Sequence, residues 1–125
     1  MMGKIDIKRI YEPAARSDGQ RILIDRIWPR GVSKEAAALD LWCKEIAPSA
    51  ALRKWFGHEP ARFQDFSDRY RRELDDNPEA VQVLCGLSAK SHITLLYGAH
   101  DKACNHAVVL ARYLGSHCKK ARGNR

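Results

Sequence analysis

One segment, His92 to His106, constrains the fold more than any other part of this chain. It opens with the short apolar run 93–97, breaks at Gly98, turns strongly polar, and then enters the apolar run 107–111. This pattern predicts a strand, a loop and a helix in that order. Polar side chains gathered where a strand hands over to a helix are typical of a ligand site in an α/β protein.

Two further strands are predicted near the N-terminus. Residues 5–10 alternate apolar and polar side chains, and residues 21–25 form a run rich in β-branched residues. A long, mostly helical middle separates the second strand from the strand at 93–97, which indicates a crossover between parallel neighbours. We therefore predict an α/β fold: a small three-layer domain in which helices flank a short, partly parallel sheet of three to four strands.

Local signals divide the middle of the chain into short helices. Ser33 and Ser49 are predicted N-caps, Gly57 is a predicted helix end, and Asn77 with the following proline begins another helix. Residues 36–47 fit both a strand and a helix, because their apolar positions match either period.

Two longer helices follow from side-chain spacing. The last helix is expected to run from about Asn105 to Leu114, with Gly115 as its C-cap. An apolar stripe on an earlier helix is predicted to pack in the core, while its charged opposite face is solvated. The stripe consists of Phe63, Phe66, Tyr70 and Leu74.

Composition and charge restrict the class of protein. The 125 residues are 45% hydrophobic and 30% charged, as expected for one soluble domain. We expect no membrane segment, because no apolar run approaches the roughly 20 residues needed, and no signal peptide, so a cytoplasmic location. The formal net charge is +7, and residues 119–125 contain four basic side chains. The prediction is a single domain over residues 1–118 and a flexible basic tail over 119–125, which could contact nucleic acid.

The four cysteines carry no recognisable motif. None forms a C-x-x-C pair, and in a reducing compartment disulfides are not expected. Cys104 has the position of a nucleophile, after a strand and at a helix start. However, the arginine that cysteine phosphatases place six residues later is replaced by Leu110, and the loop is not rich in glycine. Most of the thiols are expected to act as small core side chains.

A metal site at the polar loop is a further alternative. Its side chains are of the right chemical types, but their spacing matches no known metal motif. The four side chains are those of His100, Asp101, Cys104 and His106. The prediction is that the chain holds no metal and no cofactor.

Two polar sets should meet if the second and third strands are parallel neighbours, because their carboxyl ends then lie at one edge of the sheet. The ligand-binding candidates are Asp25, Arg26, Trp28, Arg30, Tyr97 and Asn105, and the acid–base candidates are His106, His100 and Asp101.

Each candidate has an expected role. Arg26, Arg30 and the helix N-terminus would bind an anion. Asp25 would orient an arginine, Trp28 would form a wall, and Asn105 would fix the loop. A histidine oriented by Asp101 would exchange protons. The alternative is that the same residues form structural ion pairs and caps.

Several motifs together resemble a known family. They are Arg21-Ile22-Leu23-Ile24-Asp25-Arg26-Ile27-Trp28-Pro29-Arg30-Gly31, Leu39-Asp40-Leu41-Trp42, Ala47-Pro48-Ser49, Leu52-Arg53-Lys54-Trp55-Phe56, Thr94-Leu95-Leu96-Tyr97 and Asn105-His106-Ala107. With these motifs, residues 5–114 resemble the YeaO-like branch of the family called domain of unknown function 488. The resemblance implies a compact bacterial α/β protein and supplies no function. A longer branch carries a Cys-His-Arg motif whose arginine is missing here, so no cysteine mechanism is carried over.

Three functional hypotheses remain open from the sequence. The first is a protein with an anion-accepting pocket for a small ligand, with or without catalysis. The second is a binding module for nucleic acid or a protein partner, which would use the basic surface and tail. The third is that the polar cluster only holds loops in shape.

Overall fold

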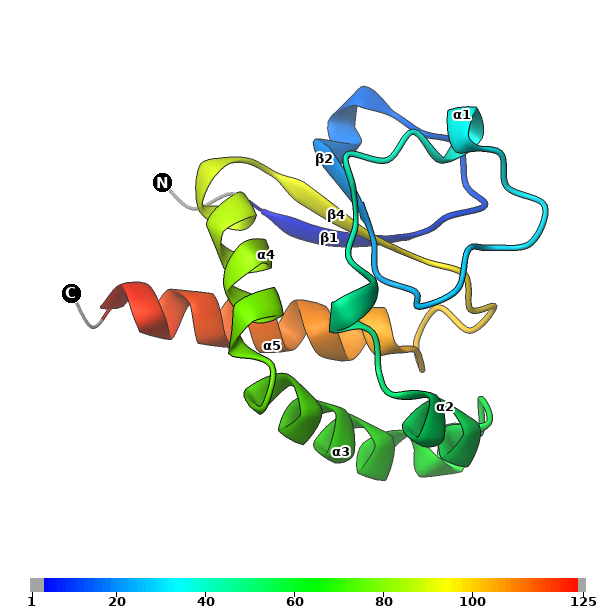
Figure 1. The fold of residues 1–125 in the computed structure, drawn as a ribbon, viewed down its shortest axis with the longest axis vertical. Coiled ribbons are helices and arrows are strands. Elements are labelled where there is room, and N and C mark those ends of the chain that lie inside the picture. The colour runs from blue at the N-terminus through cyan, green and yellow to red at the C-terminus, as the bar shows by residue number, and fades with distance from the viewer. Residues whose placement is uncertain (1–3, 124–125) are drawn as a thin grey trace.

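A computed structural model describes residues 4–123, with the side chains of residues 4–118, and shows one four-stranded sheet (Figure 1). The strand order is β1-β4-β2-β3, and each strand pair is parallel. The strands are β1 (Ile5–Arg9), β2 (Gln20–Leu23), β3 (Leu41–Trp42) and β4 (Ile93–Tyr97). The prediction of a small α/β domain is confirmed, and the sheet is parallel throughout.

Strand β4 is the centre of the sheet. Its Leu95 is in register with Ile7 of β1 on one side and with Ile22 of β2 on the other. All five residues of β4 are buried. A parallel strand covered on both faces needs apolar side chains in both directions, which explains why 93–97 is mostly apolar without strict alternation, with Thr94 as its one polar residue.

One face of the sheet carries the main core. Ile22, Ile93 and Leu95 point into it and are fully buried. In Figure 1 the larger helices gather on this side, with α5 nearest the sheet and α3 beyond it. The helices are α2 (Ala50–Phe56), α3 (Phe63–Asp75), α4 (Pro78–Lys90) and α5 (His106–Gly123). The predicted stripe of α3 is confirmed, because Phe66, Tyr70 and Leu74 are buried in this core and Phe63 packs against it.

The opposite face has a thinner cover. Leu23 and Leu96 are buried there beneath the short helix α1 (Lys34–Ala37) and the loop segments around it. Beside them Arg21, only 4% exposed, pairs with Asp18 at 2.6 Å and donates two hydrogen bonds to the Ala37 carbonyl. This third layer is therefore mostly loop, fixed by a buried ion pair as well as by apolar contacts.

The predicted helix boundaries in the middle of the chain largely hold. The hydroxyl oxygens of Ser33 and Ser49 accept hydrogen bonds from amides three residues later, and Gly57 ends α2 in the left-handed conformation. Asn77 precedes α4, but its side chain donates to the Glu45 carbonyl and does not cap the helix. The ambiguous stretch 36–47 contains the end of α1, strand β3 and one of three 3₁₀ turns. These turns are Arg16–Asp18, Lys44–Ile46 and Pro60–Arg62.

Helix α5 corrects one prediction, since it passes through Gly115 and continues to Gly123. Leu110, Leu114 and Cys118 follow each other at four-residue intervals and are all buried, so the apolar face persists beyond the glycine. That burial outweighs the cost of about 1 kcal/mol for a glycine inside a helix. The side chains of the predicted tail, 119–125, lie outside the described residues, and the tail stays a prediction.

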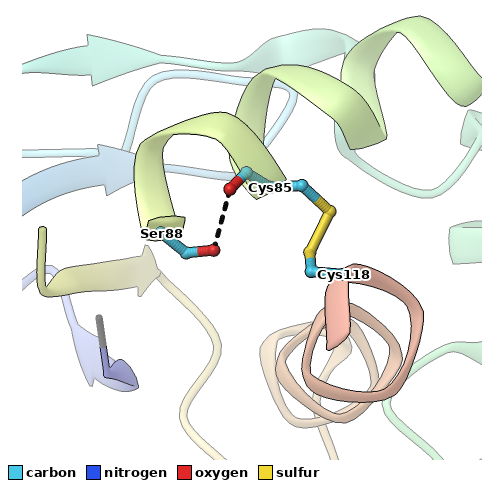
Figure 2. The surroundings of a disulfide bond; sticks show 3 residues. All are labelled: Cys85, Ser88 and Cys118. Carbon is cyan, nitrogen blue, oxygen red and sulfur yellow. Dashed lines mark hydrogen bonds between the residues drawn. A yellow bond between two sulfur atoms is a disulfide. The ribbon is translucent and has the colours of Figure 1, made fainter. Parts of the chain in front are cut away.

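A disulfide corrects the prediction that the cysteines are all free. Cys85 of α4 and Cys118 of α5 are joined, with their Cα atoms 5.4 Å apart (Figure 2). The two residues lie 33 positions apart on helices that face each other, a proximity that their scattered sequence positions could not reveal. Among the described residues, Cys43 and Cys104 are free thiols.

Candidate functional site

A pocket of about 680 Å³ opens where β2 and β4 end. Three segments supply most of its lining: residues 25–29 after β2, residues in 47–58 around α2, and residues 98–106 between β4 and α5. Tyr11 and Phe66 complete it. Most members of the two polar sets expected to converge from the sequence therefore share one concave surface, with α2 as an additional wall.

A histidine–aspartate pair links the two strand ends. Nε2 of His106 lies 3.0 Å from Oδ1 of Asp25 and 3.2 Å from the Ile24 carbonyl oxygen. Both neighbours are acceptors, so Nε2 carries the proton and, in the neutral ring, Nδ1 is unprotonated. The ring N–H is aligned with the carbonyl, and Oδ1 receives no aligned hydrogen bond. The other oxygen, Oδ2, accepts from the Gly98 amide at 2.9 Å.

Asp101 and Asn105 shape the loop between β4 and α5. Oδ1 of Asp101 accepts from the amides of Ala103 and Cys104 at 2.8 and 2.9 Å. The Cys104 amide, and then the Ala103 amide, hold the pKa of Asp101 below its usual range. Asn105, 2% exposed, donates to the Asp101 carbonyl and accepts from the Val108 amide. Asn105 thus fixes the loop as expected, while the carboxylate beside His106 is Asp25 and not Asp101.

Arg26 and Trp28 occupy the wall that follows β2. Arg26 is exposed and donates to the Ala47 carbonyl at 3.2 Å, which leaves other guanidinium N–H groups available at the pocket. Trp28 donates to the Val32 carbonyl at 2.7 Å and meets Trp42 edge to face, with ring centroids 5.3 Å apart. Both residues line the pocket.

Two of the predicted site residues lie elsewhere. The exposed side chain of Arg30 is not part of the pocket lining, and its carbonyl accepts a hydrogen bond from the Tyr11 hydroxyl. Tyr97 is 2% exposed and packs in the main core, where burial raises its pKa. His100 does line the pocket, as an exposed residue of its rim.

Three residues in or just after α2 also line the pocket, and no sequence signal pointed to them. Arg53, Phe56 and His58 line the pocket, and Nε of Arg53 is shielded from solvent with no partner in the described structure. The N-cap at Ser49 had predicted the helix itself. Only the packing of α2 beside the strand ends assigns Arg53 to the site, and no local pattern carries that information.

The charged side chains of the pocket differ in how many of their polar atoms already have hydrogen-bond or ion-pair partners. Asp25 accepts from Gly98 and faces His106, and Asp101 is bonded to loop amides. Arg26 donates one hydrogen bond, to a backbone carbonyl, and Arg53 has an unpaired Nε. The unpaired buried atoms of the pocket are therefore of both signs, Nε of Arg53 and Oδ1 of Asp25, and its two guanidinium groups are the ones that suit an oxyanion.

The metal alternative finds no support among the residues that the structure describes. They contain no group of three or more His, Cys, Asp or Glu side chains placed to hold a metal ion. Asp101 and His106, two of the four ligands considered, are engaged with loop amides and with Asp25.

In the described range no helix is both long and apolar enough to cross a membrane.

Comparison with known proteins identifies the family. The model of the inactive DUF488-N3 subclade matches residues 4–125. The chain belongs to this family. It is 46% identical over 112 residues to the Escherichia coli (strain K12) protein named "Uncharacterized protein YeaO", covering 90% of this chain and 97% of the relative. It is 41% identical over 111 residues to "Uncharacterized protein Rv3073c" of Mycobacterium tuberculosis, covering 89% and 93%. No solved structure matches this member of the DUF488-N3 subclade. The predicted family resemblance is confirmed.

Proposed function

We propose that this protein binds a small anionic ligand, with a carboxylate or phosphate group, in the pocket at the ends of β2 and β4. The observation that carries the proposal is that Arg53 and Arg26, from two different segments, line one 680 Å³ pocket. Volumes in this range are typical of small-molecule sites. Guanidinium groups match oxyanions in both charge and geometry.

Arg53 supplies the sharper support. Its Nε is shielded from water and unpaired, and leaving a buried N–H of a charged group without a partner is costly. An unsatisfied group of this kind often marks the place of an ion or water molecule. An anion held by the guanidinium would supply the missing charge partner.

The observations favour ligand binding over catalysis. The family is described as an inactive subclade, and Leu110 stands where a cysteine phosphatase would need arginine. The acid–base candidate His106 is engaged through Nε2 with the Ile24 carbonyl, and the proposed role of its neutral ring is to accept a hydrogen bond from the ligand at Nδ1.

Titration calorimetry with inorganic phosphate at low ionic strength tests the proposal. The variant Arg53→Met should bind at least about tenfold more weakly, a loss of about 1.4 kcal/mol. Arg53→Lys should recover part of that loss, because it restores the charge but not the planar fork. Arg30→Met is the matched control, since Arg30 is exposed and lies outside the pocket.

The outcomes separate clearly. Phosphate binding that is weakened by Arg53→Met and unchanged by Arg30→Met supports the pocket. Equal losses in both variants would indicate a general effect of net charge. Absence of phosphate binding to the natural protein would contradict the proposal.

The alternative function, contact with nucleic acid through the basic surface, is favoured only by the net charge of +7. On α3 the guanidinium of Arg69 stacks over the Trp55 ring at 4.1 Å, and Arg62 donates to the Trp55 carbonyl. These arginines have structural contacts of their own. Binding of a DNA duplex that falls steeply with salt would favour this alternative.

A further inference from the structure

The exposed apolar side chains of this protein are concentrated at the pocket. Among the described residues three large hydrophobic side chains are exposed: Ile27 at 66%, Val83 at 51% and Tyr11 at 47%. Ile27 and Tyr11 both line the pocket, whereas Val83 lies on α4 away from it. Single exposed apolar residues are common on any protein, but two on the rim of one concavity indicate contact with an apolar group.

The floor of the pocket is also apolar. Phe56 and Phe66 are 6% and 1% exposed, and their rings stack with centroids 4.4 Å apart. Ala47, which is buried, and Pro48 line the same pocket. An inorganic anion would satisfy the arginines but would leave most of this apolar surface, and most of the volume, unused.

We infer that the ligand is a flat aromatic or heteroaromatic ring that bears one oxyanion group. The inference rests on the proposed anion-binding function and adds the chemical class of the ligand. The oxyanion would lie at Arg53 and Arg26, and the ring would lie against the apolar wall between Ile27 and Phe56. A pocket with mostly apolar walls and a few convergent polar groups is the usual form of a site for such a molecule.

Two probes of equal charge test this inference. Phenyl phosphate and methyl phosphate carry the same anionic head and differ in the apolar body. Titration calorimetry of the natural protein should show phenyl phosphate binding at least about tenfold more tightly. Benzoate compared with acetate repeats the test with a carboxylate head, and benzyl alcohol tests the ring without the charge.

A pair of variants tests whether the pocket causes the tighter binding of phenyl phosphate relative to methyl phosphate. Ile27→Ser removes an apolar group that is largely exposed, so folding should be retained, and it should reduce the preference for phenyl over methyl phosphate by at least about threefold. Val83→Ser removes a similarly exposed side chain outside the pocket and should leave the preference unchanged.

Different results would overturn the aromatic inference and the anion-binding function. Equal affinity for phenyl and methyl phosphate, with both weakened by Arg53→Met, would overturn the aromatic inference and leave anion binding intact. Equal reduction of the preference by Ile27→Ser and Val83→Ser would also overturn it. Binding of benzyl alcohol as tight as that of phenyl phosphate would instead overturn the anionic function, and no binding of any probe would overturn both.

Discussion

Oδ2 of Asp25 accepts a hydrogen bond of 2.9 Å from the amide of Gly98, 73 residues later in the chain. This bond closes the end of β2 onto the end of β4. The fit is tight, because a Cβ atom at Gly98 would lie 3.0 Å from the same carboxylate oxygen. Asp25 therefore holds the loop geometry on which the pocket depends, as well as the ring of His106.

The first prediction concerns this carboxylate. Asp25→Ala leaves the Gly98 amide without its acceptor and should lower the free energy of unfolding by about 1–3 kcal/mol. Urea unfolding followed by circular dichroism measures the loss. Asp6→Ala is the control, because the Asp6–His92 pair has similar geometry but more exposed side chains. Its loss should stay below about 1 kcal/mol, and equal losses in the two variants would contradict the prediction.

The second prediction concerns Gly19, which approaches another backbone closely. Its φ is +65°, and a Cβ atom there would lie 2.3 Å from the His92 carbonyl oxygen. Gly19→Ala should cost about 3 kcal/mol or more, because conformational strain and a clash with backbone combine. Gly31 has φ +79° but nothing within 4 Å of a Cβ atom, so Gly31→Ala should cost only about 1–2 kcal/mol. Urea midpoints that rank the two variants the other way would refute this account.

The third prediction concerns the disulfide between Cys85 and Cys118. Closing a loop of this length should contribute about 3–4 kcal/mol by restricting the unfolded chain. Dithiothreitol should therefore lower the urea midpoint of the natural protein and leave that of Cys85→Ser unchanged. As an independent check, iodoacetamide in denaturant without reductant should modify Cys43 and Cys104 only. Modification of all four cysteines would show that the bond is not formed.

The fourth prediction concerns acid stability and the buried carboxylate of Asp18. Burial by itself raises the pKa of Asp18, but the Ala15 amide, Lys8 and Arg21 outweigh it and hold the pKa below the ordinary 3.8. A lowered folded pKa stabilises the protein above the unfolded value of about 3.9, and the stability is lost as the pH falls through that region toward the folded pKa.

Asp18→Asn should accordingly cost about 3–5 kcal/mol at pH 7, because it leaves Arg21 buried without its partner. The difference from the natural protein should shrink as urea titrations are taken from pH 6 to pH 3. Asp68→Asn breaks an exposed pair with Arg71 and should cost less than about 1 kcal/mol. A loss for Asp18→Asn that stays constant with pH would rule out the proposed linkage.

Much of the fold could be predicted because its signals are local. The apolar run 93–97 reports a central parallel strand, and the caps at Ser33 and Ser49 act within one helical turn. The end of α5 was misjudged at Gly115, because a glycine is a local signal and the burial that overrides it at Leu114 and Cys118 is tertiary. The disulfide was not predicted, because it too depends on tertiary packing.

The residues of the candidate site likewise divide into those placed by the strand topology and those placed by tertiary packing. Arg26 and Trp28 lie in the segment after β2, and His106 begins the helix that follows β4, so the parallel topology brings them to one edge. Arg53 belongs to a helix whose direction across that edge is set by packing. Arg30 was expected in the pocket from the same motif as Arg26, but the chain turns after Trp28 and takes its side chain outside.

The strand order has a consequence for the growing polypeptide. Strand β4 lies between β1 and β2, yet it is made some seventy residues after β2. On the ribosome the first two strands therefore have no ladder to share, and only the short β2–β3 pairing is available until residues 93–97 emerge. Assembly of the sheet must then be a late event, completed when the last strand inserts between two waiting edges.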